Sequence, residues 1–295
     1  ITLIVGGGYH GKSTLLNAIL GEKIAITTEK PQTTRNAIRG IYTHYSDDEL
    51  PEDLQMIFID TPGIHRPRTK LGSYMTDAAI GTLKEVDAII FIVDDKLSDG
   101  PGDKYIVDLL DDVVTPKILV INKIDKMQPD EFAEIYKEYE DLGLFEEIIG
   151  VSAKEGTHVE NVIKEVAQFM EEGPMYFPDD MITEHPERFV VSEIIREKIL
   201  MYLQDEVPHG VAVEIEQYKE EEKITKIHAV IYCEKKSHKG MIIGKGGRKL
   251  KGIGKSAREE IEVLLGTKVY LELWVKVKEN WRDSDVALSN FGYKE

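Results

Sequence analysis

The chain has 295 residues, and 42% of them are hydrophobic, which is enough to build folded cores and argues against a disordered polymer. An apolar run of about 18 residues and a secretory leader pattern are both missing, and the single cysteine, Cys233, excludes an internal disulfide and a thiolate metal cluster. The net charge of −17 argues at first against a nucleic-acid partner.

The first predicted strand leads into a glycine-rich loop. The apolar strand 2–5 is followed by GGGYHGKS at residues 6–13 and by a helix that begins at Ser13. This order matches the P-loop pattern, in which backbone N–H groups converge on phosphate oxygens at a helix N-terminus. The Lys12 ammonium is expected to reach the β and γ phosphates, and the Ser13 hydroxyl to ligate Mg²⁺. The residues expected to bind phosphate are Gly6, Gly8, Tyr9, His10, Gly11, Lys12, Ser13 and Thr14.

A polar segment, KPQTTR at residues 30–35, separates this helix from the next strand. A threonine hydroxyl at this place can complete Mg²⁺ coordination when GTP is bound. Thr34 is the first choice and Thr33 the second, and an ordinary polar surface loop is an equally open interpretation of the segment.

Two strands come next, at 37–42 and 55–59. A polar loop without a helix joins them, so we expect them to pair antiparallel. The second strand ends in DTPG at residues 60–63. Asp60 can hold Mg²⁺ and the Gly63 N–H can contact the γ-phosphate, although an ordinary turn would have the same sequence.

The rest of the first half alternates strands with amphipathic helices. Strands are expected at 88–93, 117–121 and 147–151, and helices at 72–85, 104–111, 131–142 and 159–170. This alternation predicts an α/β domain with a mostly parallel six-stranded sheet that has helices on both faces.

Two further motifs follow strands of this sheet. NKID at residues 122–125 places Asn122, Lys123 and Asp125 where the Asp125 carboxylate can accept hydrogen bonds from guanine N1–H and N2–H₂. SAK, which comprises Ser152, Ala153 and Lys154, follows the last strand and suits a backbone N–H aimed at guanine O6. Ligands bind at the carboxyl ends of strands in open α/β sheets, so the motifs together predict a GTP site.

The composition changes at residues 173–186, which are rich in proline, glycine and acids and are interpreted as a linker. We therefore predict domains at 1–172 and 187–295. The second has a helix at 187–203, strands at 211–217 and 226–233, helices from 240 and at 248–265, and a strand at 269–277. Along this last strand we expect Trp274 to pack against protein, and stacking on bases is the alternative.

Charge is unevenly distributed between the two parts. Residues 1–184 hold 17 basic and 35 acidic residues, a net of −18, whereas residues 185–295 hold 20 and 19, a net of +1. The stretch 235–258 carries nine basic residues and no acidic one, and it contains the GKGG loop at 244–247. A glycine loop of this kind lets four nucleotides of single strand approach the backbone. The residues expected to bind RNA are Ile242, Ile243, Gly244, Lys245, Gly246, Gly247, Arg248, Lys249 and Lys251.

These motifs resemble the Era family of bacterial GTPases over nearly the whole chain. The similar segments are the P-loop, KPQTTR, DTPGIH (60–65), NKID and SAK in the first half, and SEIIREK (192–198), IIGKGG (242–247) and YLELWVKVKENW (270–281) in the second. The resemblance implies a Ras-like GTPase domain followed by an α+β type II KH domain. It also implies binding to small-subunit ribosomal RNA near its 3′ end and a role in 30S subunit assembly and maturation.

The P-loop departs from the family pattern. The family usually has GRPNVGKS, so Gly7, Gly8, Tyr9 and His10 replace Arg, Pro, Asn and Val. The replaced asparagine helps to coordinate K⁺ in related GTPases, which puts K⁺ stimulation in doubt here. His10 is a loop side chain or, alternatively, a catalytic aid. Ile64 cannot polarise water, so we expect slow intrinsic hydrolysis.

The resulting hypothesis is a cytoplasmic, monomeric, Mg²⁺-dependent GTPase switch that binds GTP and GDP and acts on the 30S subunit. An RNA-binding module with a catalytically weak GTPase is one alternative. A membrane-associated signalling GTPase is another, and a peripheral inner-membrane contact is left open beside the cytoplasmic location.

Overall fold

The computed structural model describes residues 1–28, 30, 33–48, 50–64, 69–83, 85–97, 101–204 and 207–293, so Pro31, Gln32 and His65 of the quoted motifs lie outside the described residues. The chain divides into two compact units. The first unit comprises residues 1–67 and 75–184, and the second comprises residues 68–74 and 185–295.

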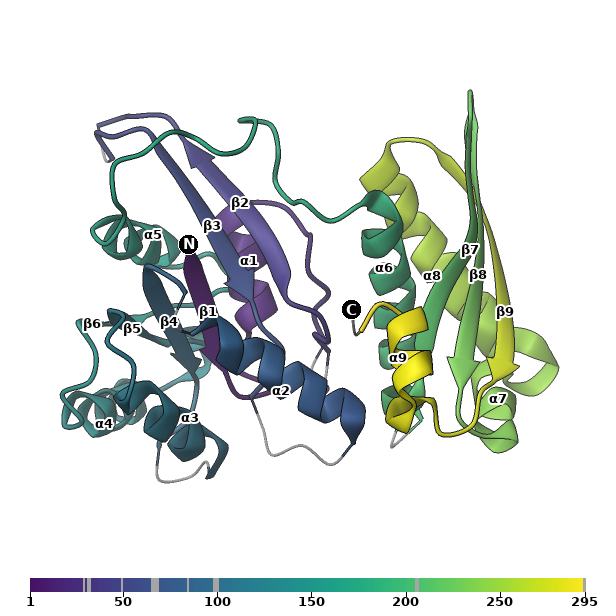
Figure 1. The fold of residues 1–295 in the computed structure, drawn as a ribbon, viewed down its shortest axis with the longest axis horizontal. Helices are drawn as coiled ribbons and strands as arrows, with labels where there is room; N and C mark the ends of the chain where they lie inside the picture. The colour runs from purple at the N-terminus through teal and green to yellow at the C-terminus, as the bar shows by residue number, and fades with distance from the viewer. Residues whose placement is uncertain are drawn as a thin grey trace. The chain divides into compact units, whose positions relative to one another are not determined.

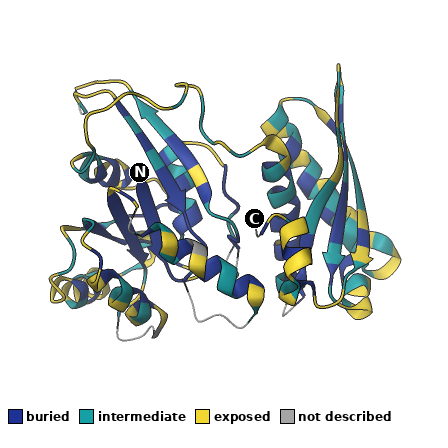
Figure 2. Ribbon diagram, in the orientation of Figure 1, coloured by how far each residue is buried: buried dark blue, intermediate teal, exposed yellow. Residues whose placement is uncertain are grey.

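The first unit contains a six-stranded sheet in the order β2-β3-β1-β4-β5-β6 (Figure 1). All neighbours pair parallel except β2 and β3, which pair antiparallel as the missing helix between them predicts. Strands β1, β4 and β5 are buried along their whole length, as expected of central strands covered on both faces (Figure 2). The strands are β1 (Thr2–Gly6), β2 (Ile38–His44), β3 (Leu54–Asp60), β4 (Ala88–Val93), β5 (Lys117–Ile121) and β6 (Glu147–Gly150).

Helices cover both faces of this sheet. Apolar residues of α2, α3 and α4 share one core with β1, β3, β4 and β5, while α1 and α5 contact each other and the sheet. The helices are α1 (Lys12–Leu20), α2 (Lys70–Thr82), α3 (Pro101–Asp111), α4 (Pro129–Glu140) and α5 (Val159–Ala167). The expected α/β architecture is confirmed, and the carboxyl ends of its parallel strands carry the motif residues.

The segment expected to be a linker makes specific contacts with the first unit. The side chain of Gln55 on β3 accepts hydrogen bonds from the backbone N–H of Tyr176 (2.8 Å) and Phe177 (2.9 Å) and donates one to the Phe177 carbonyl (2.9 Å). Thr183 forms an antiparallel bridge with Gly40 on β2. We call residues 176–184 the returning segment, and these bonds hold it against the sheet.

The second unit has the order α6, β7, β8, α7, α8, β9 and α9, which extends the predicted αββααβ pattern by one short helix. Strands β7 and β8 pair antiparallel, and β8 and β9 pair parallel. One core joins α6, α7 and α8 to the sheet. The elements are α6 (Glu187–Tyr202), β7 (Ala212–Glu221), β8 (Ile224–Cys233), α7 (Lys236–Ile243), α8 (Arg248–Leu265), β9 (Lys268–Val277) and α9 (Asp285–Asn290).

Alternation along β9 decides where its side chains lie. Val269 and Val275 are buried in the helix-covered core and Leu271 and Leu273 pack against it, whereas Trp274 is 58% exposed. The expectation that Trp274 packs against protein is therefore wrong: it lies on the opposite face, where its indole N–H donates to Glu272 (3.0 Å).

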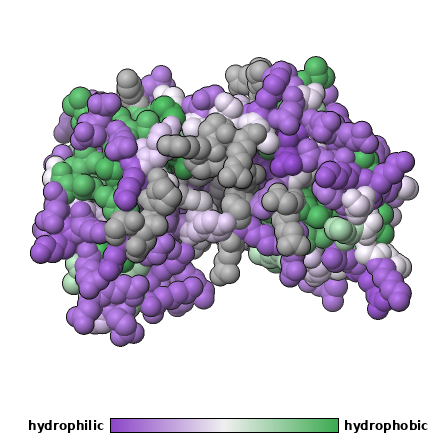
Figure 3. Space-filling model, turned by 90° about the horizontal axis from the view of Figure 1, so that it is seen from below, coloured by the Kyte–Doolittle hydropathy of each residue, from purple (hydrophilic) through white to green (hydrophobic). Residues whose placement is uncertain are grey.

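The surface in view in Figure 3 is mostly hydrophilic, with smaller hydrophobic patches between the polar residues. Within the described part of the chain, every helix is too short or too polar to cross a membrane.

Candidate functional site

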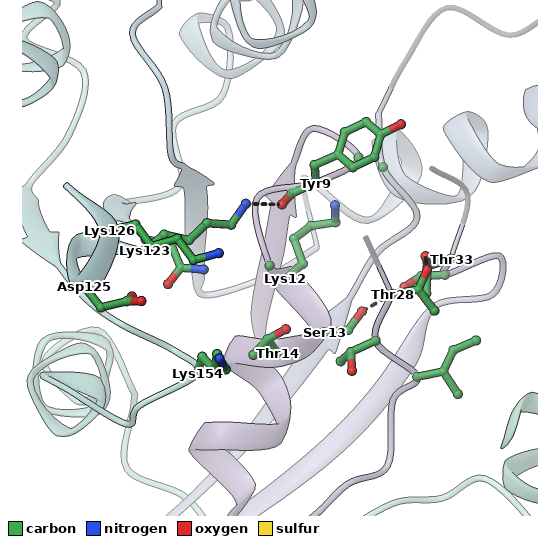
Figure 4. Close-up of a pocket in the computed structure, with 17 residues that line it drawn as sticks. Tyr9, Lys12, Ser13, Thr14, Thr28, Thr33, Lys123, Asp125, Lys126 and Lys154 are labelled. Atoms are coloured by element: carbon green, nitrogen blue, oxygen red, sulfur yellow. Dashed lines mark hydrogen bonds between the residues drawn. The ribbon is translucent and has the colours of Figure 1, made fainter. Parts of the chain in front are cut away.

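A cavity of about 440 Å³ lies where β1, β3, β5 and β6 end. The P-loop, DTPG, NKID and SAK motifs, which follow these strands and which we call the strand-end motifs, all contribute to it. Figure 4 shows Asp125 and Lys154 at one end, Thr28 and Thr33 at the other, and Lys12, Ser13 and Thr14 between them. The lining residues are Gly8, Tyr9, Gly11, Lys12, Ser13, Thr14, Ile26, Thr27, Thr28, Thr33, Thr34, Gly63, Asn122, Lys123, Asp125, Lys126 and Lys154.

The phosphate loop fits closely against its neighbours. Gly11 has a φ of 91°, and a Cβ there would come within 2.5 Å of the Asn122 amide nitrogen. A Cβ on Gly63 would come within 3.1 Å of the Gly8 Cα, so the DTPG loop lies directly against the phosphate loop. At Gly11, only glycine combines the left-handed backbone conformation with such close approach.

Lys12 is buried, and its ammonium donates hydrogen bonds to the carbonyls of Gly6 (3.2 Å) and Gly7 (2.6 Å). Burial lowers the pKa of Lys12, and the carboxylates of Asp60 and Asp103 oppose that shift. A cation held in a buried phosphate loop is suited to an anionic ligand, because the ligand supplies the charge partner that water cannot.

The side chains of Ser13, Thr34 and Asp60 bring their oxygen atoms together next to Lys12. The Ser13 hydroxyl lies 2.9 Å from the Thr34 hydroxyl and donates to the Asp60 carboxylate at 2.5 Å, while Thr34 donates to the same carboxylate at 3.4 Å. Burial raises the pKa of Asp60 to about 6, although Lys12 and the two hydroxyl groups lower it. The Oδ1 atom of Asp60 is buried and lacks a hydrogen-bond partner among the described residues.

These groups fit a magnesium ion, since Mg²⁺ prefers hard oxygen ligands and the second Asp60 oxygen is left without a partner. The geometry also distinguishes Thr33 from Thr34, the two candidate Mg²⁺ ligands of this loop. The Thr33 hydroxyl donates to the Lys30 carbonyl (2.6 Å) and lies 2.6 Å from the Thr28 hydroxyl, so it is used within its own loop, whereas Thr34 faces Ser13 and Asp60.

The base end is organised by hydrogen bonds between motifs. Ser152 donates to the Asp125 carboxylate (2.6 Å), which is the first cause of the lowered pKa of Asp125. The Asn122 side chain accepts from the Ala153 N–H (3.0 Å) and donates to the His10 carbonyl (2.8 Å). An ionised Asp125 therefore faces the cavity, ready to accept the paired donors of guanine.

Some expected site residues act behind the cavity instead of lining it. Five expected site residues are absent from its lining, and each contacts a lining residue through the bonds above: Gly6, His10, Asp60, Ser152 and Ala153. The His10 ring points away, toward Asp94 and Asp103. Sequence reasoning missed Ile26, Thr27, Thr28 and Lys126, whose only available signal was their position next to a motif.

The predicted RNA loop lies in the second unit between α7 and α8. Gly244, Gly246 and Gly247 have φ values of 73°, 62° and 75°. A Cβ on Gly246 or Gly247 would meet no atom within 4 Å, whereas one on Gly244 would meet the Lys249 Cβ at 2.7 Å. The loop is therefore closed by Gly244 on its inner side and open to a ligand at the other two glycines.

The side chains around this loop are mostly exposed and basic. Lys245, Arg248 and Lys251 are exposed, and Lys249 is half-buried. Ile242 is fully buried in the core, so it does not offer an apolar surface to bases and the prediction for it is wrong. Ile243 is partly buried and packs against the same core.

Comparisons with known proteins find family models that match each of the two units. Residues 2–123 match the family model described as a 50S ribosome-binding GTPase, and residues 206–282 match that of the KH domain. The GTPase Era of Alkaliphilus oremlandii is 59% identical over 98% of this chain and 97% of its own length. That of Clostridioides difficile is 55% identical over 99% and 97%.

Solved structures are similar over the full length. An Aquifex aeolicus Era variant bound to GDP·AlF4⁻ has a TM-score of 0.92 and 38% identity, covering 100% of this chain and 98% of its own. An Era structure in complex with MgGDPNP and nucleotides 1506–1542 of 16S ribosomal RNA gives the same values.

Proposed function

This chain belongs to the Era family of GTPases, and we propose that it is a GTP-dependent switch that binds small-subunit ribosomal RNA near its 3′ end and assists 30S subunit maturation. The observation that carries the proposal is the meeting of all four strand-end motifs around one cavity, in a chain that also presents an open, basic glycine loop.

The phosphate end holds and orients the nucleotide. Lys12 and the backbone of the phosphate loop bind the β and γ phosphates, and the Gly63 N–H faces the γ-phosphate from the DTPG loop. Ser13, Thr34 and Asp60 would hold Mg²⁺, which supplies positive charge against the phosphate oxygens. Loss of the γ-phosphate removes the contacts that order the Thr34 and Gly63 loops, which is the basis of the switch.

Slow hydrolysis follows from the residue after Gly63. The side chain of Ile64 is 1% exposed and belongs to the core of the first unit, so it neither reaches the cavity nor offers a hydrogen bond to water. A water nucleophile must then be oriented by backbone groups or by a partner, and we expect bound RNA or the ribosomal subunit to change the rate.

Four narrower statements stay predictions. Tyr9, which lines the cavity in place of the family's asparagine, leads us to expect weak or absent K⁺ stimulation. A monomeric state, a cytoplasmic location and a peripheral membrane contact rest on the sequence and the resemblance alone.

Crosslinking to ribosomal subunits followed by sequencing of the bound RNA tests the proposal, with GTP and GDP compared in parallel. We expect crosslinks near the 3′ end of 16S RNA that are stronger with GTP. Crosslinks spread evenly over both subunits, or identical with both nucleotides, would contradict it.

Single-turnover GTP hydrolysis separates the switch from an RNA-binding module with a weak GTPase. The switch predicts a faster rate when a 16S 3′ fragment is added, whereas the module predicts RNA binding with a rate that does not respond.

A further inference from the structure

The His10 side chain is buried between two carboxylates. Its Nδ1 atom forms a hydrogen bond with Asp94, the residue after β4, and its Nε2 atom lies 3.1 Å from Asp103 in the first turn of α3. The His10 and Asp103 side chains are 10% and 5% exposed, so this pairing is shielded from water. Two carboxylates on opposite ring nitrogens require both nitrogens to be donors, which is the charged form of histidine.

Charge balance supports that form. Burial lowers the pKa of His10, but hydrogen bonds and charges from Asp103 and Asp94 outweigh burial and raise it to about 9. Burial raises the pKa of Asp94, yet His10 and Lys123 outweigh it and hold that pKa below its usual range. The other titratable groups that face this cluster are Lys12 on α1, Asp95 after β4 and Tyr139 on α4.

The neighbouring glycine makes room for the ring. A Cβ on Gly7 would lie 2.6 Å from the His10 Nε2 atom and 2.9 Å from Cδ2. Gly7 lacks a positive φ, so its own backbone would accept a side chain. The main obstacle is the imidazole ring, and the Asp103 Oδ1 atom is farther away at 3.3 Å. Gly7 and His10 therefore form a sterically matched pair.

The Asp94 carboxylate, which pairs with His10, also contacts a residue of the NKID motif at the base end of the site. Asp94 pairs through its second oxygen with the Lys123 ammonium, and Lys123 also donates to the Tyr9 carbonyl (2.9 Å). These contacts connect the phosphate loop, through Asp94, to the NKID loop at residues 122–125, which we call the guanine loop. A loop with glycine at residues 6, 7 and 8 loses much conformational freedom on ordering, and these contacts hold the loop in the conformation described here.

We propose that the His10 imidazolium is a positioning residue that locks the phosphate loop against Asp94 and Asp103 and, through Asp94 and Lys123, couples it to the guanine loop. The His10 side chain would therefore affect the affinity for the nucleotide and not the hydrolysis step. This proposal rests on the proposed function of the same site. Because the lock needs the charged ring, affinity is retained at neutral pH and falls as pH rises through about 9.

His10→Gln tests the charge. We expect GDP and GTP to bind about tenfold more weakly, a change of about 1.4 kcal/mol, while single-turnover hydrolysis at saturating GTP changes less than about twofold. Calorimetry from neutral pH to pH 10 should show a steeper loss of affinity in the native protein than in the variant. Guanine and Lys12 also titrate at high pH, but they do so in both proteins, so the difference reports on His10. His228→Gln in the second unit, where the ring lies 3.2 Å from the Glu272 carboxylate and far from the phosphate loop in sequence, is the matched control.

Gly7→Ala tests the geometry and serves also if His10→Gln fails to fold. It should weaken binding about tenfold in the native background and less than about twofold in a His10→Val background, where the colliding ring is gone. Equal losses in both backgrounds, native affinity in His10→Gln, or parallel pH profiles would each overturn the lock. Absence of guanine nucleotide binding by the native protein would instead contradict the proposed function.

Discussion

At the scale of single residues, base selectivity depends on the Asp125 carboxylate. Asp125→Asn replaces one acceptor oxygen with a donor, so the guanine N1–H and N2–H₂ groups lose a partner in the cavity. We expect GTP affinity to fall at least about 100-fold, since buried polar groups left unpaired are costly. Calorimetry with GTP and with xanthosine triphosphate, which has a carbonyl in place of the amino group, measures the effect.

The xanthine nucleotide should bind the variant better than GTP does. Asp130→Asn, an exposed residue on α4, is the control and should leave both affinities unchanged. Unaltered GTP affinity in Asp125→Asn would remove Asp125 from the base site.

Residue types were easier to predict than side-chain directions. The motifs identified Lys12, Ser13 and Asp60 because strand ends of a parallel sheet converge, which the sequence pattern can reveal. The choice between Thr33 and Thr34 stayed open, since neighbouring residues in an irregular loop point in unrelated directions. Ile242 was assigned to RNA because it adjoins the glycine loop, whereas the turn of α7 places it in the core.

At the scale of elements, the loop between α7 and α8 carries the second prediction. Gly246→Asp adds a negative charge at an open position where the backbone has a φ of 62°. We expect RNA affinity to fall at least about tenfold while GTP hydrolysis without RNA is unchanged, because the phosphates would meet a carboxylate. Binding of a 16S 3′ fragment and single-turnover hydrolysis measure the two effects.

Gly266→Asp at the C-terminus of α8 is a matched control. Gly266 has a φ of 63°, and a Cβ there also meets no atom within 4 Å, so both variants have the same backbone cost of about 1–2 kcal/mol. Equal losses of RNA affinity in the two would show that backbone strain, rather than the loop's charge, is responsible.

The returning segment gives a third prediction. Gln55→Ala removes three hydrogen bonds to the backbone of Tyr176 and Phe177, and we expect a loss of about 1–3 kcal/mol in the stability of this attachment. Amide hydrogen exchange at Tyr176 and Phe177 should accelerate about tenfold or more. Gln168→Ala, whose exposed side chain donates to the Glu165 carboxylate (2.9 Å), should leave these two amides unchanged.

Exchange at the native rate in Gln55→Ala would mean that Thr183 and its neighbours hold the segment alone. Sequence patterns did not reveal this attachment. Hydrophobic periodicity revealed the regular strands and helices, and the helix-free loop between β2 and β3 revealed the antiparallel pair. Residues 176–184, in contrast, are held by backbone groups and by polar side chains such as Gln55, Thr183 and Tyr45, which leave no periodic signal. The short α9 was missed for a similar reason, since six residues contain too few turns for a pattern.

At the scale of the whole molecule, the part of the chain that binds the nucleotide is acidic and the part expected to bind RNA contains a basic stretch. The acidic first 184 residues, at −18, would repel RNA, whereas the basic stretch 235–258 provides a local positive potential. Because phosphate contacts release counterions, RNA affinity should fall as salt concentration rises.

Lys251→Gln should reduce the slope of log affinity against log salt by about 0.7, the value for one contact to a single strand. Lys104→Gln, exposed on α3, is the control. Titrations of a 16S 3′ fragment between about 50 and 200 mM salt would measure both slopes, and equal slopes in the native and Lys251→Gln proteins would exclude a phosphate contact by Lys251.

The returning segment has one further consequence for the intact molecule. β2 lies at one edge of its sheet, and the Ile41 N–H donates to the Ile182 carbonyl (2.9 Å) beside the bridge between Gly40 and Thr183. An uncovered outer strand offers free amide and carbonyl groups to another molecule, which is a common route to aggregation. By occupying part of that edge, the residues that connect the two units also protect the sheet from pairing with a second copy.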